Sequence, residues 1–322
     1  MRAVTIQTYG DPDGMSARDV PEPRVEPDQL LIGTEAIGVG GVDAVIRRGT
    51  VGGGAFGVGH VPGSEVAGTV LAVGDDIDDG WVGRHVWAFT GLGGAYAERA
   101  VARLEDVVAL PDGLSSVDAV TIGSAAPVAH FALEHGRFVA GARVLIRGAA
   151  GSIGIAAVEL AARAGASAVA VTTSSPARGE RLRTLGATEV LDRSGKDAAL
   201  RTDGQFDVIL DIAGGPELPD FLERLAPNGR FVLVGVVAGY PPPDFGTSLF
   251  GLFQRSLSFS TFSLDTVSRP DLSRVRRELF DAVGRGELHP VVHDILPLER
   301  AADAHRVIDQ GEVFGRIVLT TS

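Results

Sequence analysis

Three glycines spaced three residues apart could hold a phosphate group on bare backbone. They are Gly148, Gly151 and Gly154, and they follow an apolar run at residues 144–146. A stretch of small residues with apolar positions at helical spacing comes next, over residues 153–164. A strand, a glycine turn and a helix in this order let a pyrophosphate approach the backbone at the positive end of the helix dipole. The segment therefore predicts a dinucleotide-binding turn rather than an ordinary tight turn. The expected contacts are Gly148, Ala149, Ala150, Gly151, Ser152, Ile153 and Gly154.

Hydroxyl and guanidinium groups follow the next predicted strand. Sites specific for NAD place an acidic residue at the end of this strand, where it binds the ribose 2′-hydroxyl. This chain has Thr173, Ser174 and Ser175 there, with Arg178 close behind and Arg193 after the following strand. Such groups suit a 2′-phosphate through charge-assisted hydrogen bonds, so the sequence favours NADPH over NADH. The alternative is that Arg178 is only a surface charge of its helix.

The elements that would carry these residues alternate between strands and helices. Further strand candidates lie at residues 167–175, 189–192, 206–215, 230–237 and 256–262. This alternation predicts parallel strands joined by helical crossovers, which form a doubly wound Rossmann sheet. We place this nucleotide domain at residues 117–285.

The first hundred residues have a different pattern. Their short apolar runs are separated by Gly, Pro and Asp turns, which is typical of a mostly antiparallel β domain. The tail, with a helix near residues 298–310 and a final strand, is too short for a core of its own. We therefore expect residues 1–116 and 286–322 to form one domain and residues 117–285 to form the other. The nucleotide is expected in the cleft between the two domains.

Composition narrows the function classes. The 322 residues are 45% hydrophobic and 22% charged, as in soluble globular proteins. The formal net charge of −12 would repel nucleic acid and anionic membranes, so neither is an expected partner. The chain has no cysteine, which excludes disulfides and a cysteine nucleophile. No charged-then-apolar leader opens the sequence and no apolar run reaches membrane-spanning length, so we expect a cytoplasmic protein.

Motifs along nearly the whole chain resemble the zinc-independent quinone oxidoreductase branch of the medium-chain dehydrogenase/reductase superfamily. Besides the glycine turn, they are IGVGGVDAVIRRG (37–49), VPGSEVAGTVLAVG (61–74), GGAYAERAVA (93–102), FDVILDIAG (206–214), GRFVLVG (229–235) and ADAHRVIDQGEVFGRIVL (302–319). The resemblance implies an α/β protein in which a GroES-like, mostly antiparallel β catalytic domain joins a Rossmann domain, and it implies a homodimer. The expected cofactor contacts also include Val128, Gly214, Val234, Gly235 and Arg316.

The resemblance also bears on metal binding. In zinc-dependent relatives, two cysteines and the histidine of a Gly-His-Glu motif hold the catalytic zinc. The corresponding positions here are Gly40, Ser64 and Ser124. Glycine offers no ligand, and zinc prefers thiolate or imidazole donors to a serine hydroxyl. The spacing of the seven histidines fits no metal site either, so we expect no metal.

Polar groups typical of the zinc-independent relatives are replaced in this chain. Those relatives carry an asparagine, tyrosines and a threonine around the acceptor. The aligned positions here are Gly40, Val45, Val51 and Val128. We therefore expect a more apolar pocket. Its remaining catalytic candidates are Asp43, Ser64, Ser124 and Tyr240, with Glu65 as a further polar group.

Some of these side chains also have a structural interpretation. Asp43 can brace the turn after Gly41, Glu65 can pair with an arginine, and Tyr240 can shield its proline-rich loop.

The leading hypothesis is hydride transfer from NADPH to a small apolar acceptor, a quinone or a related enone. A hydride can add to carbon of such acceptors while water protonates the resulting anion, so orientation carries most of the rate. One alternative is reduction of an enoyl thioester or a natural-product enone. Another is an NADPH-binding sensor or a non-redox biosynthetic enzyme on the same scaffold.

Overall fold

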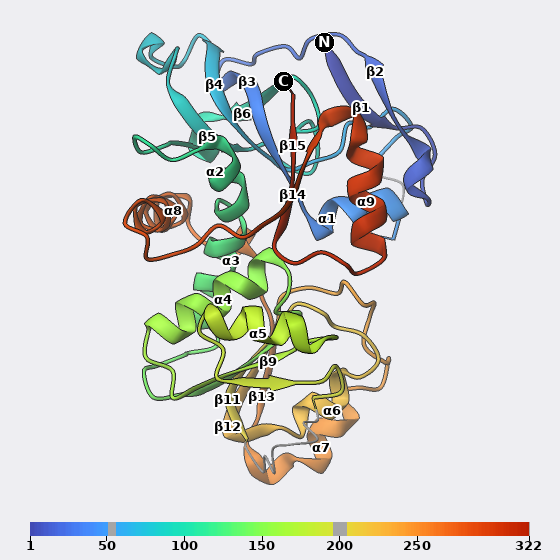
Figure 1. Cartoon of the computed structure of the whole chain (residues 1–322), viewed down its shortest axis with the longest axis vertical. Helices are drawn as coiled ribbons and strands as arrows, with labels where there is room; N and C mark the ends of the chain where they lie inside the picture. Colours follow the sequence, from blue (N-terminus) through green and yellow to red (C-terminus); the bar gives the residue numbers. More distant parts are fainter. Residues whose placement is uncertain (51–55, 196–204, 322) are drawn as a thin grey trace. The chain divides into compact units, whose positions relative to one another are not determined.

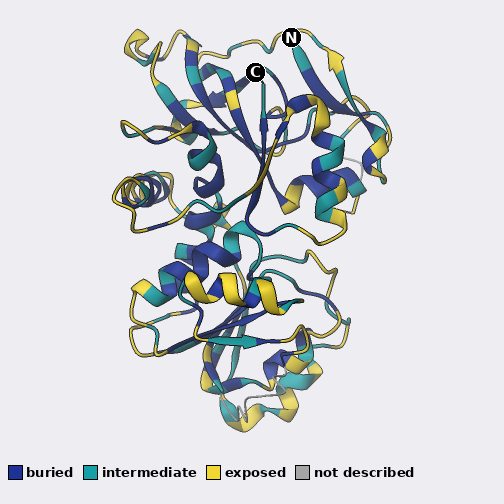
Figure 2. Ribbon diagram, in the orientation of Figure 1, coloured by how far each residue is buried: buried dark blue, intermediate teal, exposed yellow. Residues whose placement is uncertain are grey.

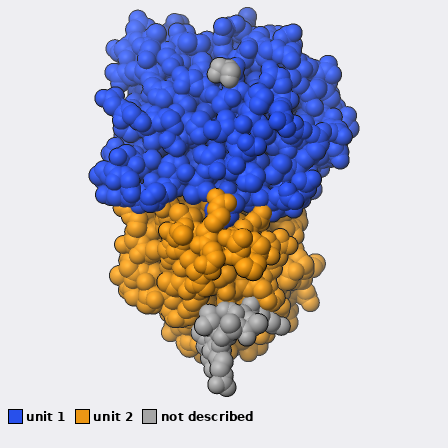
Figure 3. Space-filling model, viewed as in Figure 1, with its two compact units in different colours: residues 1–124, 268–322 blue, residues 125–267 orange. Residues whose placement is uncertain are grey.

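The chain folds into two compact units (Figure 3). The computed structural model describes residues 1–50, 56–195 and 205–321. The first unit consists of Met1–Ser124 and Ser268–Ser322, and the second consists of Ala125–Val267. The chain therefore leaves the first unit, forms the second and then returns.

The first unit is built on a seven-stranded sheet (Figure 1). Its order is β14-β15-β3-β4-β5-β7, with β6 also paired to β3, and a separate hairpin joins β1 to β2. Every pair is antiparallel except β14 with β15, which confirms the mostly antiparallel β domain. The strands are β1 (Arg2–Ile6), β2 (Met15–Asp19), β3 (Gln29–Val39), β4 (Glu65–Val73), β5 (His85–Phe89), β6 (Arg99–Arg103), β7 (Val107–Ala109), β14 (Val292–Pro297) and β15 (Arg316–Thr320).

Among its described residues this unit has four α-helices, and two of them lie almost entirely within residues 117–285, the predicted nucleotide domain. Helix α2 contacts β3, β4 and β15, and α8 contacts α2 and β7. Their apolar faces are covered by the first unit, so the unit boundaries fall at 124/125 and 267/268 rather than at 116/117 and 285/286. The helices are α1 (Gly41–Arg48), α2 (Ser116–Ile122), α8 (Arg269–Gly284) and α9 (Ala301–Asp309), with 3-10 turns η1 (Pro12–Gly14), η2 (Asp79–Trp81), η3 (Leu104–Asp106) and η6 (Leu298–Arg300).

The second unit is a six-stranded, wholly parallel sheet with the order β10-β9-β8-β11-β12-β13. The order reverses between β8 and β11, which confirms the doubly wound Rossmann sheet. The strands are β8 (Arg143–Arg147), β9 (Ala168–Thr172), β10 (Glu189–Leu191), β11 (Phe206–Asp211), β12 (Leu225–Leu233) and β13 (Ser258–Thr261). The helices are α3 (Ala125–His135), α4 (Ser152–Arg163), α5 (Pro176–Thr184), α6 (Leu218–Leu222) and α7 (Thr247–Gly251), with 3-10 turns η4 (Phe253–Arg255) and η5 (Leu264–Thr266).

Burial explains why the central strand is apolar. Val144, Leu145 and Ile146 of β8 are fully buried, as expected of a parallel strand covered on both faces. Figure 2 colours the whole ribbon by burial. Helix α5 is different, since only Gly179 and Leu182 are buried and the rest of the helix is partly or largely exposed.

One segment, Ser116–His135, is long and apolar enough to cross a membrane by length and composition alone. It comprises α2 and α3, and 67% of its most apolar window is buried inside the protein. Its apolar residues are therefore core residues of the folded chain.

Candidate dinucleotide and acceptor sites

The glycine turn joins β8 to α4. Gly148 has a φ of +78°, a left-handed conformation that favours glycine. Gly154 lies in the first turn of α4, where a Cβ atom would come within 2.5 Å of the Cα of Ala149. At Gly151, by contrast, a Cβ atom would meet only the Gly148 carbonyl oxygen, at 3.8 Å. Packing therefore does not require glycine at position 151, and the space beside it leaves bare backbone for a ligand.

The amino terminus of α4 adds a favourable field to this bare backbone. Gly151 is the N-cap residue and supplies no side chain to cap the helix. The first N–H groups of a helix lack partners within it, and the helix dipole favours an anion there. The residues present therefore fit the pyrophosphate of a dinucleotide. The other predicted contacts of the turn are Ala149, which is buried, and Ala150, Ser152 and Ile153, which are half-buried.

Two further loops leave the carboxyl ends of the parallel strands β11 and β12, as the glycine turn leaves the carboxyl end of β8. Gly214 has a φ of +66° and follows β11, while Val234 and Gly235 follow β12. A Cβ atom at Gly148 would lie 3.2 Å from the Cβ of Ile212, and one at Gly235 would lie 2.8 Å from its carbonyl oxygen. The structure thus brings these predicted cofactor contacts together. Val128, also predicted, is half-buried on α3, a helix that packs against α4.

The predicted 2′-phosphate site lies at the end of β9. Ser175 caps α5 by accepting a hydrogen bond from the Arg178 N–H at 3.3 Å, and Arg178 Nη1 donates to Ser174 Oγ at 3.3 Å. Thr173 is 9% exposed, and its Oγ1 is buried with no hydrogen-bond partner in the described part of the chain. Hydrogen bonds thus join Ser174, Ser175 and Arg178, and Thr173 precedes them directly in the chain. Arg193 is exposed beyond β10, the strand next to β9.

In the first unit, Asp43 braces the start of α1. Its carboxylate is 1% exposed, and Oδ2 accepts a hydrogen bond from the Gly40 N–H at 2.8 Å and one from the Tyr96 hydroxyl at 3.3 Å. Oδ1 is buried without a hydrogen-bond partner among the described residues. Burial raises the pKa of Asp43 to about 6, against the lowering effect of the Gly40 hydrogen bond and the Arg316 charge. The geometry is that of the turn-bracing interpretation.

A chain of buried hydrogen bonds continues behind Asp43. Arg47 Nε donates to His305 Nδ1 at 3.3 Å, and a guanidinium can only donate. The neutral imidazole therefore carries its proton on Nε2, which lies 3.0 Å from the Tyr96 hydroxyl oxygen and donates to it. Burial, assisted by the Arg47 charge, lowers the pKa of His305 to about 3, so the ring stays neutral. Arg47 is anchored in turn by Asp309, at 2.6 Å.

Glu65 forms the ion pair that one interpretation of the sequence had suggested. Its carboxylate is fully buried and accepts hydrogen bonds from Arg316 Nη2 and, at 2.9 Å, from Trp87 Nε1. The guanidinium of Arg276 stacks over the Trp87 ring at 3.9 Å. Arg316 is also a predicted cofactor contact, and that contact stays a prediction; the structure gives its guanidinium a buried carboxylate partner. Burial and fold, rather than local sequence, select that partner.

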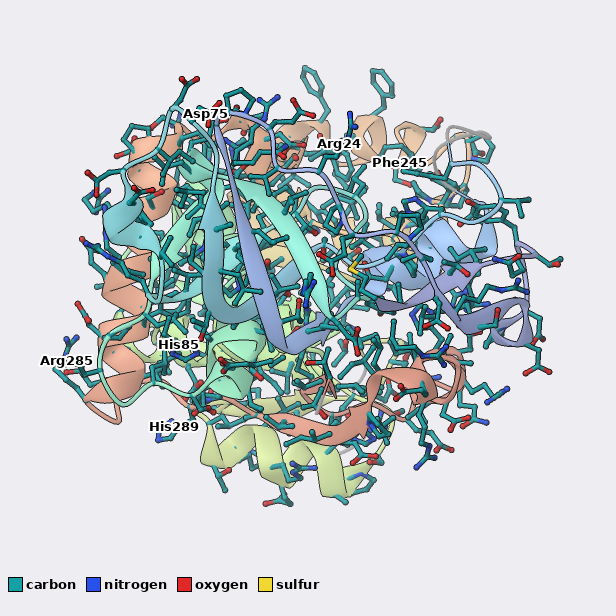
Figure 4. The ribbon with its side chains drawn as sticks, turned by 90° about the horizontal axis from the view of Figure 1, so that it is seen from above. Arg24, Asp75, His85, Phe245, Arg285 and His289 are labelled. Atoms are coloured by element: carbon teal, nitrogen blue, oxygen red, sulfur yellow. The ribbon has the colours of Figure 1, made fainter. Side chains whose placement is uncertain are left out.

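The positions aligned with zinc ligands all lie in the first unit. Gly40 is buried, Ser64 is 7% exposed and Ser124 is half-buried. Over residues 1–50, 56–195 and 205–321, no group of three or more His, Cys, Asp or Glu side chains is placed to hold a metal ion. Among the histidines, His85 lies beside α2, 2.6 Å from Ser116 Oγ, and His289 is exposed in the loop after α8 (Figure 4).

The remaining acceptor-site predictions are less constrained. Tyr240 is 68% exposed in the loop after β12. Val45 is half-buried on α1, and Val51 lies outside the described residues. A shallow hollow of about 410 Å³ in the second unit is lined by Ala142 and Asp207 among others, at the amino ends of β8 and β11. The glycine turn is at the carboxyl ends, so this hollow is not the predicted cofactor site.

Several buried polar residues were missed in the sequence analysis. Tyr96, His305 and Arg47 belong to patterns that also fit ordinary strands and helices. Arg147 and Asp211 did carry a signal, because each is a charged residue that ends an otherwise apolar strand, VLIR and VILD.

Two protein-family models match the chain. An alcohol dehydrogenase GroES-like domain matches residues 26–112, and a zinc-binding dehydrogenase matches residues 185–319. The name of the second family refers to zinc, but Gly40, Ser64 and Ser124 stand at the aligned ligand positions in this chain.

Individual relatives cover nearly the whole chain. A phenolphthiocerol/phthiocerol polyketide synthase of Mycobacterium tuberculosis is 32% identical over 98% of this chain, which spans only 14% of that protein. The quinone oxidoreductase of Sus scrofa is 30% identical over 99% of this chain and 97% of its own length. A mycobacterial protein solved in complex with NADPH is 29% identical, with a TM-score of 0.89 over 99% of both chains. Together with the fold, these matches show that the chain belongs to the medium-chain dehydrogenase/reductase superfamily of oxidoreductases, in which its relatives include the quinone oxidoreductases.

Proposed function

We propose that the protein is a zinc-independent oxidoreductase that uses NADPH to reduce an apolar quinone or a related enone. The observation that carries this proposal is the glycine turn, whose Gly151 is open to a ligand and not required by packing. The quinone oxidoreductase of Sus scrofa, similar over nearly its full length, supports the choice of acceptor. A cytoplasmic homodimer is part of the same proposal.

The residues at the carboxyl edge of the parallel sheet fit NADPH in particular. When bound, NADPH supplies a hydride to an electron-poor carbon. The turn at residues 148–151 and the start of α4 would hold its pyrophosphate. Ser174 and Arg178, next to Thr173, would hold the 2′-phosphate through a hydroxyl contact and a charge-assisted guanidinium contact. The related mycobacterial structure that contains NADPH supports this assignment.

The polar groups of the first unit fit an acceptor that needs no enzymatic base. Removal of a hydroxyl proton requires a base within hydrogen-bond reach of the substrate. Asp43 is 1% exposed and Glu65 is fully buried in an ion pair, so neither carboxylate is presented to a ligand. For the reduction of a quinone or an enone, the protein has only to orient the acceptor and to exclude competing water. Ser64 and Ser124 would supply the modest polarity at that site.

A second candidate is reduction of an enoyl thioester. It is favoured by the mycobacterial polyketide synthase, which is 32% identical over 98% of this chain. Both candidates share NADPH and hydride addition to a conjugated double bond, so they differ only in the acceptor.

Oxidation of NADPH, with NADH in parallel, tests the proposal against a panel of quinones, enones and enoyl thioesters. We expect quinone or enone turnover with a clear preference for NADPH. Turnover confined to thioesters would establish the second candidate. NADPH binding without turnover on any acceptor would overturn both and indicate a sensor or a non-redox enzyme.

The cofactor preference has its own test in Arg178→Ala. We expect the KM for NADPH to rise about tenfold or more while the KM for NADH stays nearly unchanged, because only NADPH carries the 2′-phosphate. Arg181→Ala, on the exposed side of the same helix, is the matched control. An equal loss for both cofactors would remove the 2′-phosphate assignment.

The homodimer is tested by the mass in solution. The edge strand β13 has no second neighbour in the described part of the chain, and Phe250 and Phe253 are 78% and 79% exposed. Open strand edges and exposed phenyl rings favour pairing with a second copy. Light scattering should give twice the chain mass of 33.4 kDa. A mass of one chain at micromolar concentration would contradict the homodimer.

A further inference from the structure

Two charged residues face each other at the last position of adjacent strands. Arg147 ends β8 and Asp211 ends β11, and the strand register pairs them directly. Arg147 Nη1 donates to Asp211 Oδ2 at 2.5 Å. The Arg147 side chain is 4% exposed and the Asp211 side chain is 0% exposed. The pair is therefore a fully desolvated ion pair between two strands that begin ligand-facing loops.

The Asp211 carboxylate is also bonded to the backbone of the loop that follows β11. Asp211 Oδ1 accepts hydrogen bonds from the N–H groups of Ala213 and Gly214, both at 2.9 Å. The Asp211 carbonyl accepts from the Val234 N–H at 2.8 Å, and the Arg147 carbonyl accepts from the Ile212 N–H at 3.1 Å. The pair thus fixes the 212–215 loop through the Asp211 carboxylate, and the glycine turn follows Arg147 directly in the chain.

Stability alone does not account for an ion pair at this place. Removing two charges from water is costly, and buried ion pairs are often matched or exceeded in stability by apolar side chains of similar volume. The Arg147 guanidinium also lies over the Phe221 ring, 3.8 Å from its centre, in a cation–π contact that offsets part of this cost. Geometry is what a charged pair adds, because a guanidinium and a carboxylate fix both distance and direction.

We propose that Arg147 and Asp211 are positioning residues that hold the glycine turn at the correct distance from the 212–215 loop to receive a dinucleotide pyrophosphate. Neither side chain touches the cofactor, and each acts through the backbone that it anchors. This inference rests on the proposed binding of NADPH at the turn. Arg147 and Asp211 would then determine the affinity for the cofactor without contacting it.

The test is the double variant Arg147→Met with Asp211→Asn. Methionine spans a similar length without charge, and the asparagine oxygen can still accept from Ala213 and Gly214. No buried charge is left unpaired, so we expect the melting temperature to stay within about 5 °C of the wild type. The dissociation constant for NADPH, measured by nicotinamide fluorescence well below that temperature, should rise at least about tenfold.

Two comparisons separate positioning from a purely structural role. Affinity for adenosine 2′-monophosphate, which lacks a pyrophosphate, should change less than about twofold in the double variant. Arg147→Lys keeps the positive charge but loses the planar guanidinium with its fixed set of donors. Its NADPH affinity should lie between those of the wild type and the double variant. Arg230→Met, at the opposite edge of the same sheet, is the matched control and should leave NADPH affinity unchanged.

Each outcome decides the inference. A folded double variant that binds NADPH as the wild type does would overturn it. A double variant that fails to fold would also overturn it, because the pair would then serve stability. Wild-type protein that does not bind NADPH would instead refute the proposed function itself, so the two failures are distinguishable.

Discussion

At the scale of single residues, the most unusual side chain is Asp43. Its carboxylate is buried, one oxygen has no partner among the described residues, and the other accepts from Gly40 and Tyr96. Burial raises its pKa from 3.8 to about 6. A carboxyl group whose pKa is raised by folding binds more protons in the folded state than in the unfolded state. Its ionisation therefore opposes folding between about pH 4 and pH 6.

Asp43→Asn should make this titration visible. The asparagine oxygen can keep the hydrogen bonds from Gly40 and Tyr96 but does not ionise. As pH rises from 4 to 7, the free energy of unfolding of the variant should improve relative to the wild type by up to about 3 kcal/mol. Urea unfolding at several pH values measures this difference. A difference that does not vary with pH would show that the pKa of Asp43 is not raised.

An exposed aspartate supplies the contrasting control. Hydrogen bonds from Ser268 and then Arg274 lower the pKa of Asp271, so its ionised form favours the folded state. That stability is present above the unfolded pKa and is lost as pH falls through the folded pKa. Asp271→Asn should therefore lose stability relative to the wild type as pH rises, the opposite trend to Asp43→Asn.

At the scale of elements, the strand, turn and helix of residues 143–163 contain glycines that are required for different reasons. Gly151 and Gly154 belong to one motif but meet different constraints. A Cβ atom at position 154 would be 2.5 Å from both the Ala149 Cα and the Gly148 carbonyl oxygen, and these backbone atoms cannot move aside. At position 151 the same atom meets nothing closer than 3.8 Å, and the φ of −82° suits alanine.

The variants Gly151→Ala and Gly154→Ala should therefore separate ligand binding from folding. Gly151→Ala is expected to change the free energy of unfolding by less than about 1 kcal/mol, while NADPH affinity falls at least about tenfold because the methyl group occupies the ligand's space. Gly154→Ala is expected to lower the melting temperature. Fluorescence titration and thermal unfolding measure the two effects. Full NADPH affinity in Gly151→Ala would remove the turn as the pyrophosphate site.

The elements that the sequence predicted well are those whose signals are local. Strands, glycine turns and crossover helices occupy short windows, so β8, α4 and the parallel sheet followed from their own residues. Helices α1 and α8 were not predicted. Helix α1 has only eight residues, and seven of the sixteen residues of α8 are charged (RPDLSRVRRELFDAVG). Which unit covers the buried face of α8 depends on the fold, which is why the unit boundaries differed from those expected.

In the candidate sites too, groups of sequence neighbours were predictable and contacts between distant residues were not. The polar group at residues 173–178 was predictable because its members are neighbours in sequence. The buried partners of Tyr96 and Glu65 were not, since His305 lies 209 residues from Tyr96 and Arg316 lies 251 residues from Glu65. No pattern in one sequence pairs such residues, although a buried carboxylate always requires some partner.

At the scale of the whole molecule, the second unit is an insertion within the first. Residues 1–124 and 268–322 must find each other across the intervening chain to complete the first unit. Strand β15, from the second of these segments, connects them because it pairs with β3 from the first. In the sheet it lies between β14 and β3. The Glu65 and Arg316 side chains, 251 residues apart in sequence, join the same two segments by a buried ion pair, and Trp87 supports the carboxylate.

Removal of one member of this ion pair should destabilise the first unit. Glu65→Gln removes the buried carboxylate that accepts from Arg316 Nη2, and breaking a buried pair in this way costs about 3–5 kcal/mol. Arg274→Ala, which removes two exposed ion pairs on α8, is the control and should have a small effect. Urea unfolding followed by tryptophan fluorescence reports on this unit directly, because both tryptophans of the chain, Trp81 and Trp87, belong to it. If Glu65→Gln is no less stable than the control, closure of the first unit depends on strand pairing alone, and the ion pair contributes little to joining the two ends of the chain.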